Sequence, residues 1–505
     1  MTTHIYNFLE KSLTNFSKKT AFVEPFAKER KEITYKNFDL FAKKVASEIL
    51  RKLGNDNPTQ SPILIILPKG IDCLISFFGV ALSGNFYTLL DEKSPKERVK
   101  KVIEILKPKL FITSKELKFD LALPTLYTED FESFNIDENL IQVAKEKHID
   151  TNLLYVLFTS GSTGIPKGVS IAHKSVIDYT YNICKILQIN RTSSLLNQTP
   201  FYFSASVRDI FSSVKVGATL HLLPNHLFAF PNKILHYIEE QKINIISWVP
   251  TVFTFFAKEN ILNKFKITSL KTVAWVGELM PIKTLNIWKN YIPQATFINL
   301  YGPTEIAGTC CYYRVDREFK EDEILPIGKS SNNTQILVFN EKMQLITPSQ
   351  TNQKGELYIK GSNISLGYYN DKEKTQKAFI QNPLHDNYLD LLYKTGDIVA
   401  YNEQGELLCY GRADNQIKYM GHRIELGEIE SVIDSHPKIK NSACIFKDKI
   451  ICFYESDEEL DLKAFCKERL ISYMIPNRFI QLKKFQLNQN GKIDRRVLGE
   501  IISRF

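Results

Sequence analysis

The most constraining feature of the sequence is a regular alternation of short β-rich runs with longer helical patterns. Segments such as YKNFDLFAKKVASEILR at 35–51 carry apolar side chains at helical spacing. The β-rich runs include ILIILP at 63–68, KLFIT at 109–113, YVLF at 155–158, INIISWV at 243–249 and KTVAWV at 271–276. This alternation predicts an α/β fold with mostly parallel sheets.

The length of the chain predicts more than one domain. A chain of 505 residues is too long for one compact core. After about residue 325, shorter strands separated by Gly, Asn and Asp turns predict a smaller β-rich subdomain. From about residue 415, a charged segment with helical patterns at 426–435 and 459–471 predicts a separate terminal lid.

Composition and charge exclude several classes of protein. The longest apolar stretch, CLISFFGVAL at 73–82, is too short to span a bilayer, and the amino terminus lacks the apolar segment of a secretory signal. The net charge of +9 is scattered, so phosphate ligands or an acidic protein partner explain it as well as nucleic acid does. We expect a soluble, cytoplasmic protein with no nucleic-acid and no membrane partner.

The eight cysteines show no C-x-x-C pair and no His/Cys cluster at zinc spacing. This pattern predicts reduced thiols in a cytoplasmic protein. The adjacent Cys310 and Cys311 favour strand packing over redox chemistry.

The stretch LLYVLFTSGSTGIPKGVSIAH at 153–173 begins as an apolar strand and breaks into a loop of hydroxyls and glycines that ends on Lys167. Backbone N–H groups, hydroxyls and one ammonium together form an anion cradle, which predicts a phosphate loop. The alternative is a flexible surface loop. The triphosphatase pattern G-x-x-x-x-G-K-[ST] does not fit, because after Gly161 the chain has Pro166-Lys167 instead of the required Gly-Lys.

Four further segments carry residue types suited to a nucleotide. In NLYGPTEIAG at 299–308, an aromatic ring, a tight turn, a hydroxyl and a hard carboxylate ligand for magnesium follow one another. In LYKTGDIV at 392–399, Asp397 is able to accept both hydroxyls of a ribose. The others are GRADNQIKYMGHRIELGEIE at 411–430 and NQNGKIDRR at 488–496, which presents Lys492. Each of the first two, taken alone, is as well explained by an ordinary turn.

These five segments, in this order and at these distances, resemble the core motifs of the adenylate-forming superfamily. That superfamily includes adenylation domains of nonribosomal peptide synthetases, acyl-CoA synthetases and D-alanine carrier-protein ligases. The likeness covers nearly the whole chain, and ITYKNFDLFA, GELYIKGSNISLGYYN and SYMIPNRF match further segments. It implies a large multi-subdomain N-terminal domain, 1–413, and a small mobile α+β domain, 414–505, with a hinge at Asp414.

The resemblance also implies a reaction in which a substrate carboxylate attacks the α-phosphate of ATP and pyrophosphate leaves, with Mg²⁺ as cofactor. Such a transition state gains most from fixed charge and positioning. The implied phosphate-loop residues are Thr159, Ser160, Gly161, Ser162, Thr163, Gly164 and Lys167. The other implied roles are Asn299 and Tyr301 for adenine, Gly302 for ATP binding, Thr304 for the α-phosphate, Glu305 for Mg²⁺, Asp397 and Arg412 for the ribose, and Lys492, with Thr304 and Glu305, for catalysis.

The segment after the hinge indicates the branch of the superfamily. Asp414 and Gln416, followed by RIELGEIE, resemble enzymes that serve a phosphopantetheine carrier, whereas CoA synthetases more often place a lysine at the hinge. Only residues 493–505 follow Lys492, so we expect a separate acyl carrier protein. The alternatives are an acyl-CoA synthetase and a non-catalytic nucleotide-binding homologue, against which the late lysine and the complete loop argue.

The expected acyl pocket departs from the pattern of amino-acid-activating members. They carry an aspartate after the second phenylalanine of FYFSASVRDIF, where this chain has Ser204. An ammonium left without its carboxylate partner is costly, so Ser204 favours a small acid without an α-ammonium unless Asp209 compensates. Arg208 either meets the substrate or pairs locally with Asp209. The other expected pocket residues are Phe203, Ala205, Ser247, Ala274, Val276, Leu300, Gly308 and Thr309; Val276 stands where D-alanine ligases have a cysteine.

Overall fold

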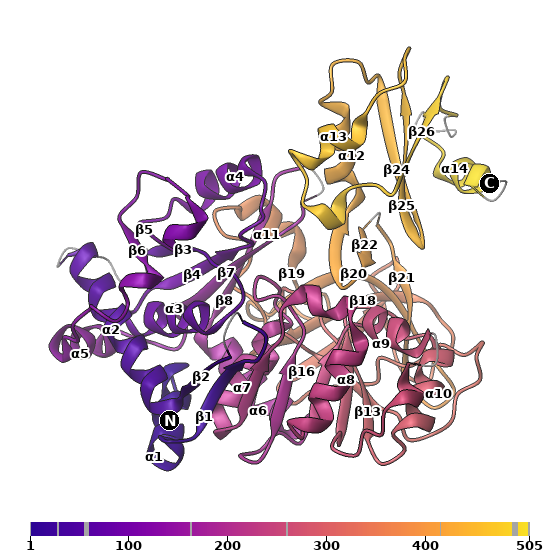
Figure 1. Cartoon of the computed structure of the whole chain (residues 1–505). Coiled ribbons are helices and arrows are strands. Elements are labelled where there is room, and N and C mark those ends of the chain that lie inside the picture. The colour runs from indigo at the N-terminus through magenta and orange to yellow at the C-terminus, as the bar shows by residue number, and fades with distance from the viewer. Residues whose placement is uncertain are drawn as a thin grey trace. The chain divides into compact units, whose positions relative to one another are not determined.

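The structure is a computed structural model, and it describes residues 2–27, 30–54, 60–161, 164–258, 261–414, 416–486 and 493–502 (Figure 1). The chain forms two compact units, which are described separately below. The main unit consists of Met1–Glu92, Lys107–Leu157 and Val169–Gly411. The second unit consists of Lys93–Leu106, Phe158–Gly168 and Arg412–Phe505.

A nine-stranded sheet runs through the main unit in the order β15-β14-β13-β12-β11-β9-β10-β1-β2. Its centre, from β13 to β1, is parallel, and β2, β14 and β15 add antiparallel edges. The strands are β1 Thr20–Glu24, β2 Lys31–Thr34, β9 Ser194–Asn197, β10 Thr219–Leu222, β11 Ile245–Trp248, β12 Thr272–Val276, β13 Thr296–Tyr301, β14 Cys311–Arg314 and β15 Lys329–Ser330. The central strands β9 to β13 are almost fully buried, as expected for a parallel sheet whose two faces are covered by helices.

A second, six-stranded sheet has the order β6-β5-β3-β4-β7-β8, and its pairs β6-β5, β5-β3, β3-β4 and β4-β7 are parallel. Its strands are β3 Pro62–Ile66, β4 Phe86–Leu90, β5 Leu110–Thr113, β6 Thr125–Tyr127, β7 Leu153–Thr159 and β8 Lys167–Ala172. All five predicted β-rich runs therefore form strands of the two large sheets, and the predicted α/β fold with mostly parallel sheets is confirmed.

The region after residue 325 forms an antiparallel sheet, as its short strands and turns predict. Its order is β17-β16-β18-β20-β19, and β21 also pairs with β20. The strands are β16 Thr334–Phe339, β17 Leu345–Ile346, β18 Gly355–Gly361, β19 Phe379–Gln381, β20 Leu391–Tyr401 and β21 Leu407–Arg412.

The helices of the main unit start and end where local sequence dictates. In α2, Tyr35–Leu53, the Thr34 hydroxyl caps the first turn by accepting the Asn37 N–H, and Gly54 ends the helix at φ +75°. The others are α1 Tyr6–Phe16, α3 Ile71–Leu82, α5 Glu138–Glu146, α6 His173–Ile186, α7 Ser206–Val216, α8 Pro231–Glu240, α9 Pro250–Ala257, α10 Ile282–Tyr291 and α11 Lys372–Ala378.

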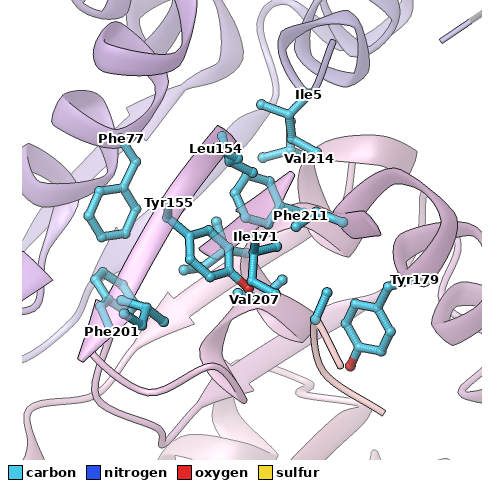
Figure 2. Close-up of a cluster of buried hydrophobic side chains, with 14 of the residues drawn as sticks. Ile5, Phe77, Leu154, Tyr155, Ile171, Tyr179, Phe201, Val207, Phe211 and Val214 are labelled. Carbon is cyan, nitrogen blue, oxygen red and sulfur yellow. The ribbon is translucent and has the colours of Figure 1, made fainter. Parts of the chain in front are cut away.

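One large hydrophobic cluster joins the sheets and helices of the main unit (Figure 2). Tyr155 and Ile171, from β7 and β8, lie beside Val207 and Phe211 of α7 in this cluster. Such side chains remove large apolar areas from water, which stabilises the unit by roughly 25 cal/mol per Å² buried. The core therefore fixes α7 and the loop before it, where several expected pocket residues lie.

The second unit has its own core of aliphatic and cysteine side chains between its helices and its strands. It contains α4 Lys96–Leu106, β22 Gln416–Tyr419, β23 His422–Glu425, α12 Leu426–Asp434, β24 Asn441–Lys447, β25 Lys449–Glu455, α13 Leu462–Lys467, β26 Arg478–Leu482 and α14 Arg495–Ile502. Helix α12 matches the pattern at 426–435. Helix α13 is shorter than the pattern at 459–471, because the Asp461 carboxylate caps it by accepting the Ala464 N–H.

Among the described helices, none combines the length and the apolar character that crossing a membrane requires. All eight cysteines lie in the described part of the chain, and each is buried without a disulfide. Cys311 lies in β14 and packs in the core beside Cys310, as expected for strand packing.

Three histidines distant in sequence meet around the amino-terminal segment of the main unit. The ring centroids of His4, His148 and His173 are 4.1–4.5 Å apart. Their spacing in the sequence predicts no such cluster. The Tyr6 N–H donates to His4 Nδ1 at 2.9 Å, and the Ile5 N–H donates to His173 Nδ1 at 3.1 Å. Both rings must therefore be neutral with the proton on Nε2, and they hold the backbone of the first residues.

The buried position of these rings opposes their protonation. Burial, helped by the charge of His148, lowers the pKa of His4 from 6.5 to about 3. Burial also lowers the pKa of His173 well below its usual range. A proton on either Nδ1 would face a backbone N–H, so acid must open this contact.

This geometry predicts that acid destabilises the protein through His4. Because the folded-state pKa is depressed, the unfolded chain binds more protons below pH 6.5, and stability is lost as the pH falls. Between pH 7 and pH 5 the wild type should lose about 2 kcal/mol more unfolding free energy than His4→Gln. Urea unfolding at several pH values measures this difference, with exposed His226→Gln as the control. An identical pH dependence in wild type and His4→Gln would refute the assignment.

Candidate active site

The turn after β13 is shaped by two glycines that approach closely. A Cβ on Gly302 would lie 2.2 Å from the Gly308 carbonyl oxygen. Gly308 has φ +126°, and its Cβ would lie 2.3 Å from the Tyr179 ring. Only glycine fits at both positions. The turn therefore closes tightly and places Thr304 and Glu305 directly beyond the end of a buried strand.

Tyr301 and Asp397 are 96 residues apart in sequence and form a buried hydrogen bond. Tyr301 ends β13, Asp397 lies in β20, and the tyrosine hydroxyl donates to the carboxylate. The Asp397 side chain is only 2% exposed. Burial and then the Asp397 charge raise the pKa of Tyr301 well above its usual range, so the hydroxyl keeps its proton and remains a donor. The structure thus brings together the expected base-binding and ribose-binding residues.

Glu305 is completely buried and is oriented by a residue that the sequence does not single out. The Tyr368 hydroxyl donates to Glu305 Oε1 at 2.7 Å, and the Glu305 carbonyl accepts the Ser365 N–H at 2.8 Å. Tyr368 lies within the segment GELYIKGSNISLGYYN, which resembles the superfamily only as a whole. Its role depends on a contact across 63 residues, which no local pattern reveals.

Two further expected residues have defined neighbours in the main unit. The Ser204 hydroxyl donates to the Thr304 hydroxyl at 3.3 Å. The Asn299 side-chain amide donates to the Pro326 carbonyl at 2.8 Å and lies in β13, two residues before Tyr301. The structure therefore places the expected acyl position 204 beside the expected α-phosphate residue.

The parallel register of β11, β12 and β13 brings most remaining pocket residues together. Ser247 pairs with Ala274, and Val276 pairs with Leu300. Phe203 and Ala205 lie in the turn before α7, and Gly308 and Thr309 follow the glycine turn. Tyr179, from α6, contacts the Thr309 hydroxyl through its own hydroxyl at 3.4 Å.

Arg208 forms the local ion pair, the second of its two expected alternatives. It is 1% exposed, and its Nε donates to Asp209 Oδ1 at 2.9 Å. One terminal nitrogen donates to the Ser247 carbonyl at 2.8 Å. The Asn197 amide donates to Asp209 Oδ2 at 2.9 Å, so the Asp209 carboxylate is already held by two side chains. Asp209 is therefore already engaged by Arg208 and Asn197.

The expected phosphate loop lies in the second unit. Its turn is closed by the Gly164 N–H, which donates to the Gly161 carbonyl at 3.0 Å, with Gly164 at φ +72°. The Thr159 hydroxyl reaches the Lys167 carbonyl at 3.5 Å. Ser162 and Thr163 lie outside the described residues, as does Lys492.

Arg412 and Asp414, expected at the ribose and the hinge, bind each other in the second unit. Arg412 donates to both Asp414 oxygens, at 2.7 Å each, in the two-pronged geometry that suits guanidinium and carboxylate. Burial by itself would raise the pKa of Asp414, but the Arg412 guanidinium lowers it below its usual value. The expected nucleotide residues are thus divided between the two units, and how they meet stays a prediction.

Comparisons with known proteins identify the protein family to which this fold and these clusters of polar residues belong. The family model described as AMP-binding enzyme matches residues 9–369. The chain therefore belongs to the AMP-binding enzyme family. It is 31% identical to gramicidin S synthase 1 of Brevibacillus brevis and 30% identical to tyrocidine synthase 1 of Brevibacillus parabrevis, in each case over 94% of this chain. The matches span only 42% and 43% of the lengths of these two relatives.

Solved structures confirm the fold. An adenylation domain of Vibrio cholerae, AlmE, solved in complex with glycyl-adenosine-5′-phosphate, superposes with a TM-score of 0.84 at 21% identity. That likeness covers 100% of this chain and 98% of the other. An NRPS protein containing adenylation and PCP domains superposes with a TM-score of 0.84 at 20% identity, over 99% of this chain and 84% of the other.

The Glu305 environment generates a prediction about Tyr368. Tyr368→Phe should lower the unfolding free energy by about 1–3 kcal/mol, because a buried carboxylate loses a donor. Urea unfolding measures the loss. The matched control is Tyr369→Phe, whose half-buried ring packs against Phe86. Equal stability of the two variants would show that the hydroxyl does not support Glu305.

Proposed function

We propose that this chain activates a small carboxylic or amino acid with ATP as an acyl-AMP, releases pyrophosphate, and transfers the acyl group to the phosphopantetheine thiol of a separate carrier protein. The observation that carries the proposal is the pair of buried carboxylates, Glu305 and Asp397, each oriented by a tyrosine hydroxyl. Burying two carboxylates is costly without a ligand that needs them. Membership of the AMP-binding enzyme family points to the same ligand.

The geometry suits a nucleotide in specific ways. A ribose offers two hydroxyl donors, and the buried Asp397 carboxylate in β20 is an acceptor suited to such donors. Tyr301 directs its hydroxyl to Asp397, and its aromatic ring is of the kind that stacks on a base. Thr304, beside Ser204, then lies where the nucleotide and the acid would meet.

The donor chemistry of Glu305 fits Mg²⁺. Its carboxylate is a hard oxygen ligand, and Tyr368 holds it in one orientation. Glu305 would hold the ion, and a divalent cation there would supply positive charge for the phosphate oxygens.

The chemical step needs fixed charge more than a protein base. A carboxylate oxygen bonds to the α-phosphorus while the bond to pyrophosphate breaks, so negative charge moves onto the leaving group. Lys167 in the loop and Lys492 near the chain end would balance that charge. Arg412 would contribute at the ribose after giving up part of its contact with Asp414.

The carrier partner and the acid follow from separate observations. The relatives named gramicidin S synthase 1 and tyrocidine synthase 1, and the structure containing adenylation and PCP domains, support a carrier-bound product and an amino acid. The neutral Ser204 argues against a substrate with an α-ammonium. The Asp209 carboxylate already binds Arg208 and Asn197, which argues in the same direction. A small acid without an α-ammonium, for instance a hydroxy acid, is the second candidate substrate. An acyl-CoA synthetase would differ only in the thiol that accepts the acyl group. Assays with CoA and with a carrier protein distinguish the two activities.

Lys492→Ala should abolish adenylate formation and leave ATP binding nearly intact, because the lysine acts in the transition state. Exchange of labelled pyrophosphate into ATP measures adenylate formation, and calorimetry measures ATP binding. We expect a loss of about 100-fold or more in the exchange rate. Exposed Lys484→Ala is the control. A Lys492 variant with more than half of the parental rate would contradict the assignment.

Matched pairs of acids test the substrate class. If the second candidate is right, lactate and glycerate should give higher kcat/KM than alanine and serine, because Ser204 cannot neutralise a cation. Ser204→Asp should then shift the preference towards the amino acid by roughly 1 to 3 kcal/mol. Higher kcat/KM for the amino acids with the parental enzyme would overturn the hydroxy-acid candidate.

A further inference from the structure

A buried carboxylate in the second unit occupies donors that belong to the phosphate loop. Glu428 lies in the first turn of α12 and is 5% exposed. Its Oε2 accepts the Gly161 N–H at 3.1 Å, and its Oε1 accepts from Arg98 at 3.3 Å. A loop N–H and a guanidinium are the two kinds of group that hold a phosphate oxygen. The Glu428 carboxylate thus has the surroundings of a bound anion.

Neighbouring loop residues are engaged by the same short segment. Lys167 Nζ lies 3.4 Å from Glu425 Oε1. The Ser160 hydroxyl donates to the Arg423 carbonyl at 2.9 Å and accepts the Glu425 N–H at 3.2 Å. Three described loop residues therefore direct polar groups to residues 423–428. A phosphate bound by these loop groups has to displace at least the carboxylates of Glu425 and Glu428.

The space beside Glu428 is a cationic cavity. It measures about 330 Å³, and its lining includes Arg98, Lys101, Gly164, Ser431 and Arg469. Lys101 donates to the Gly164 carbonyl at 2.9 Å, which ties α4 to the loop. Arg98 is only 8% exposed and forms its ion pair with Glu428. If Glu428 leaves, a buried guanidinium next to the loop requires another anion.

We propose that Glu428 is an internal competitor for the terminal phosphates of ATP and for pyrophosphate, and that Arg98 is a phosphate-positioning residue that exchanges the Glu428 carboxylate for a phosphate oxygen. This inference rests on the proposed function. Charge favours the exchange, because a phosphate carries more negative charge than the carboxylate that it replaces. Burial raises the pKa of Glu428 above its usual value, although Arg98 and the Gly161 N–H act in the opposite direction. After pyrophosphate leaves, the carboxylate would return to the loop and oppose the reverse reaction.

Calorimetric titration of the full chain with inorganic pyrophosphate tests the competition. Glu428→Gln should bind pyrophosphate about 5-fold or more tightly than the wild type, because the competing charge is gone. The matched control is Glu97→Gln, which removes an exposed carboxylate from the lining of the same cavity. Glu428→Asp keeps the negative charge on a shorter side chain, so its gain in pyrophosphate affinity should be smaller than that of Glu428→Gln.

The role of Arg98 requires the double variant. Arg98→Gln in the Glu428→Gln background should weaken pyrophosphate binding again, since the carboxylate is no longer there to mask the contact. If Arg98 only anchors Glu428, the double variant will bind as tightly as Glu428→Gln, and its proposed role is wrong. Thermal unfolding of each variant shows whether it is folded.

The remaining outcomes decide between the inference and the proposed function. Equal affinities of wild type, Glu428→Gln and Glu97→Gln would refute the competitor, as would the absence of pyrophosphate binding in all of them. The proposed function is measured separately, by acid-dependent exchange of pyrophosphate into ATP with the wild type. A chain that binds pyrophosphate as expected but exchanges it with no acid would refute the function and leave the competition in place.

Discussion

A carboxylate taken out of water needs donors or a cation, and in the main unit this requirement applies to Glu305 and Asp397 together. Tyr368 and Tyr301 meet part of it with one hydroxyl each. Each contact joins segments that are far apart in the chain: one joins β13 to β20, and the other joins the turn after β13 to the segment that follows β18. Stability and ligand geometry therefore depend on the same few atoms.

The parallel sheets explain why the pocket can be assembled from small residues. Strands in register place Ser247 beside Ala274 and Val276 beside Leu300, whatever their side chains are. We therefore expect the substrate specificity to depend on residues at the ends of strands and in turns. There, a buried Arg208–Asp209 pair fills space that another sequence could use to bind a charged substrate.

In the second unit, the expected phosphate loop already binds two carboxylates, those of Glu425 and Glu428. Backbone N–H groups and lysines do not distinguish a carboxylate from a phosphate by charge alone, so a nearby acidic helix competes for them. Glu425 and Glu428 bind the loop at the start of α12, and Lys101 of α4 binds the Gly164 carbonyl of the same loop.

Much of this molecule follows from local sequence. The alternating patterns predict the two large sheets and α2, and the motif residues predict which side chains carry polar chemistry, because periodicity and turn chemistry act over a few residues. The partners of those side chains were decided by the tertiary structure alone. Tyr368 on Glu305, Arg208 on the Ser247 carbonyl, Glu428 on Gly161 and the histidines around the amino terminus all pair residues that are distant in sequence. Burial and contact across such distances depend on how the whole chain packs, which no short pattern encodes.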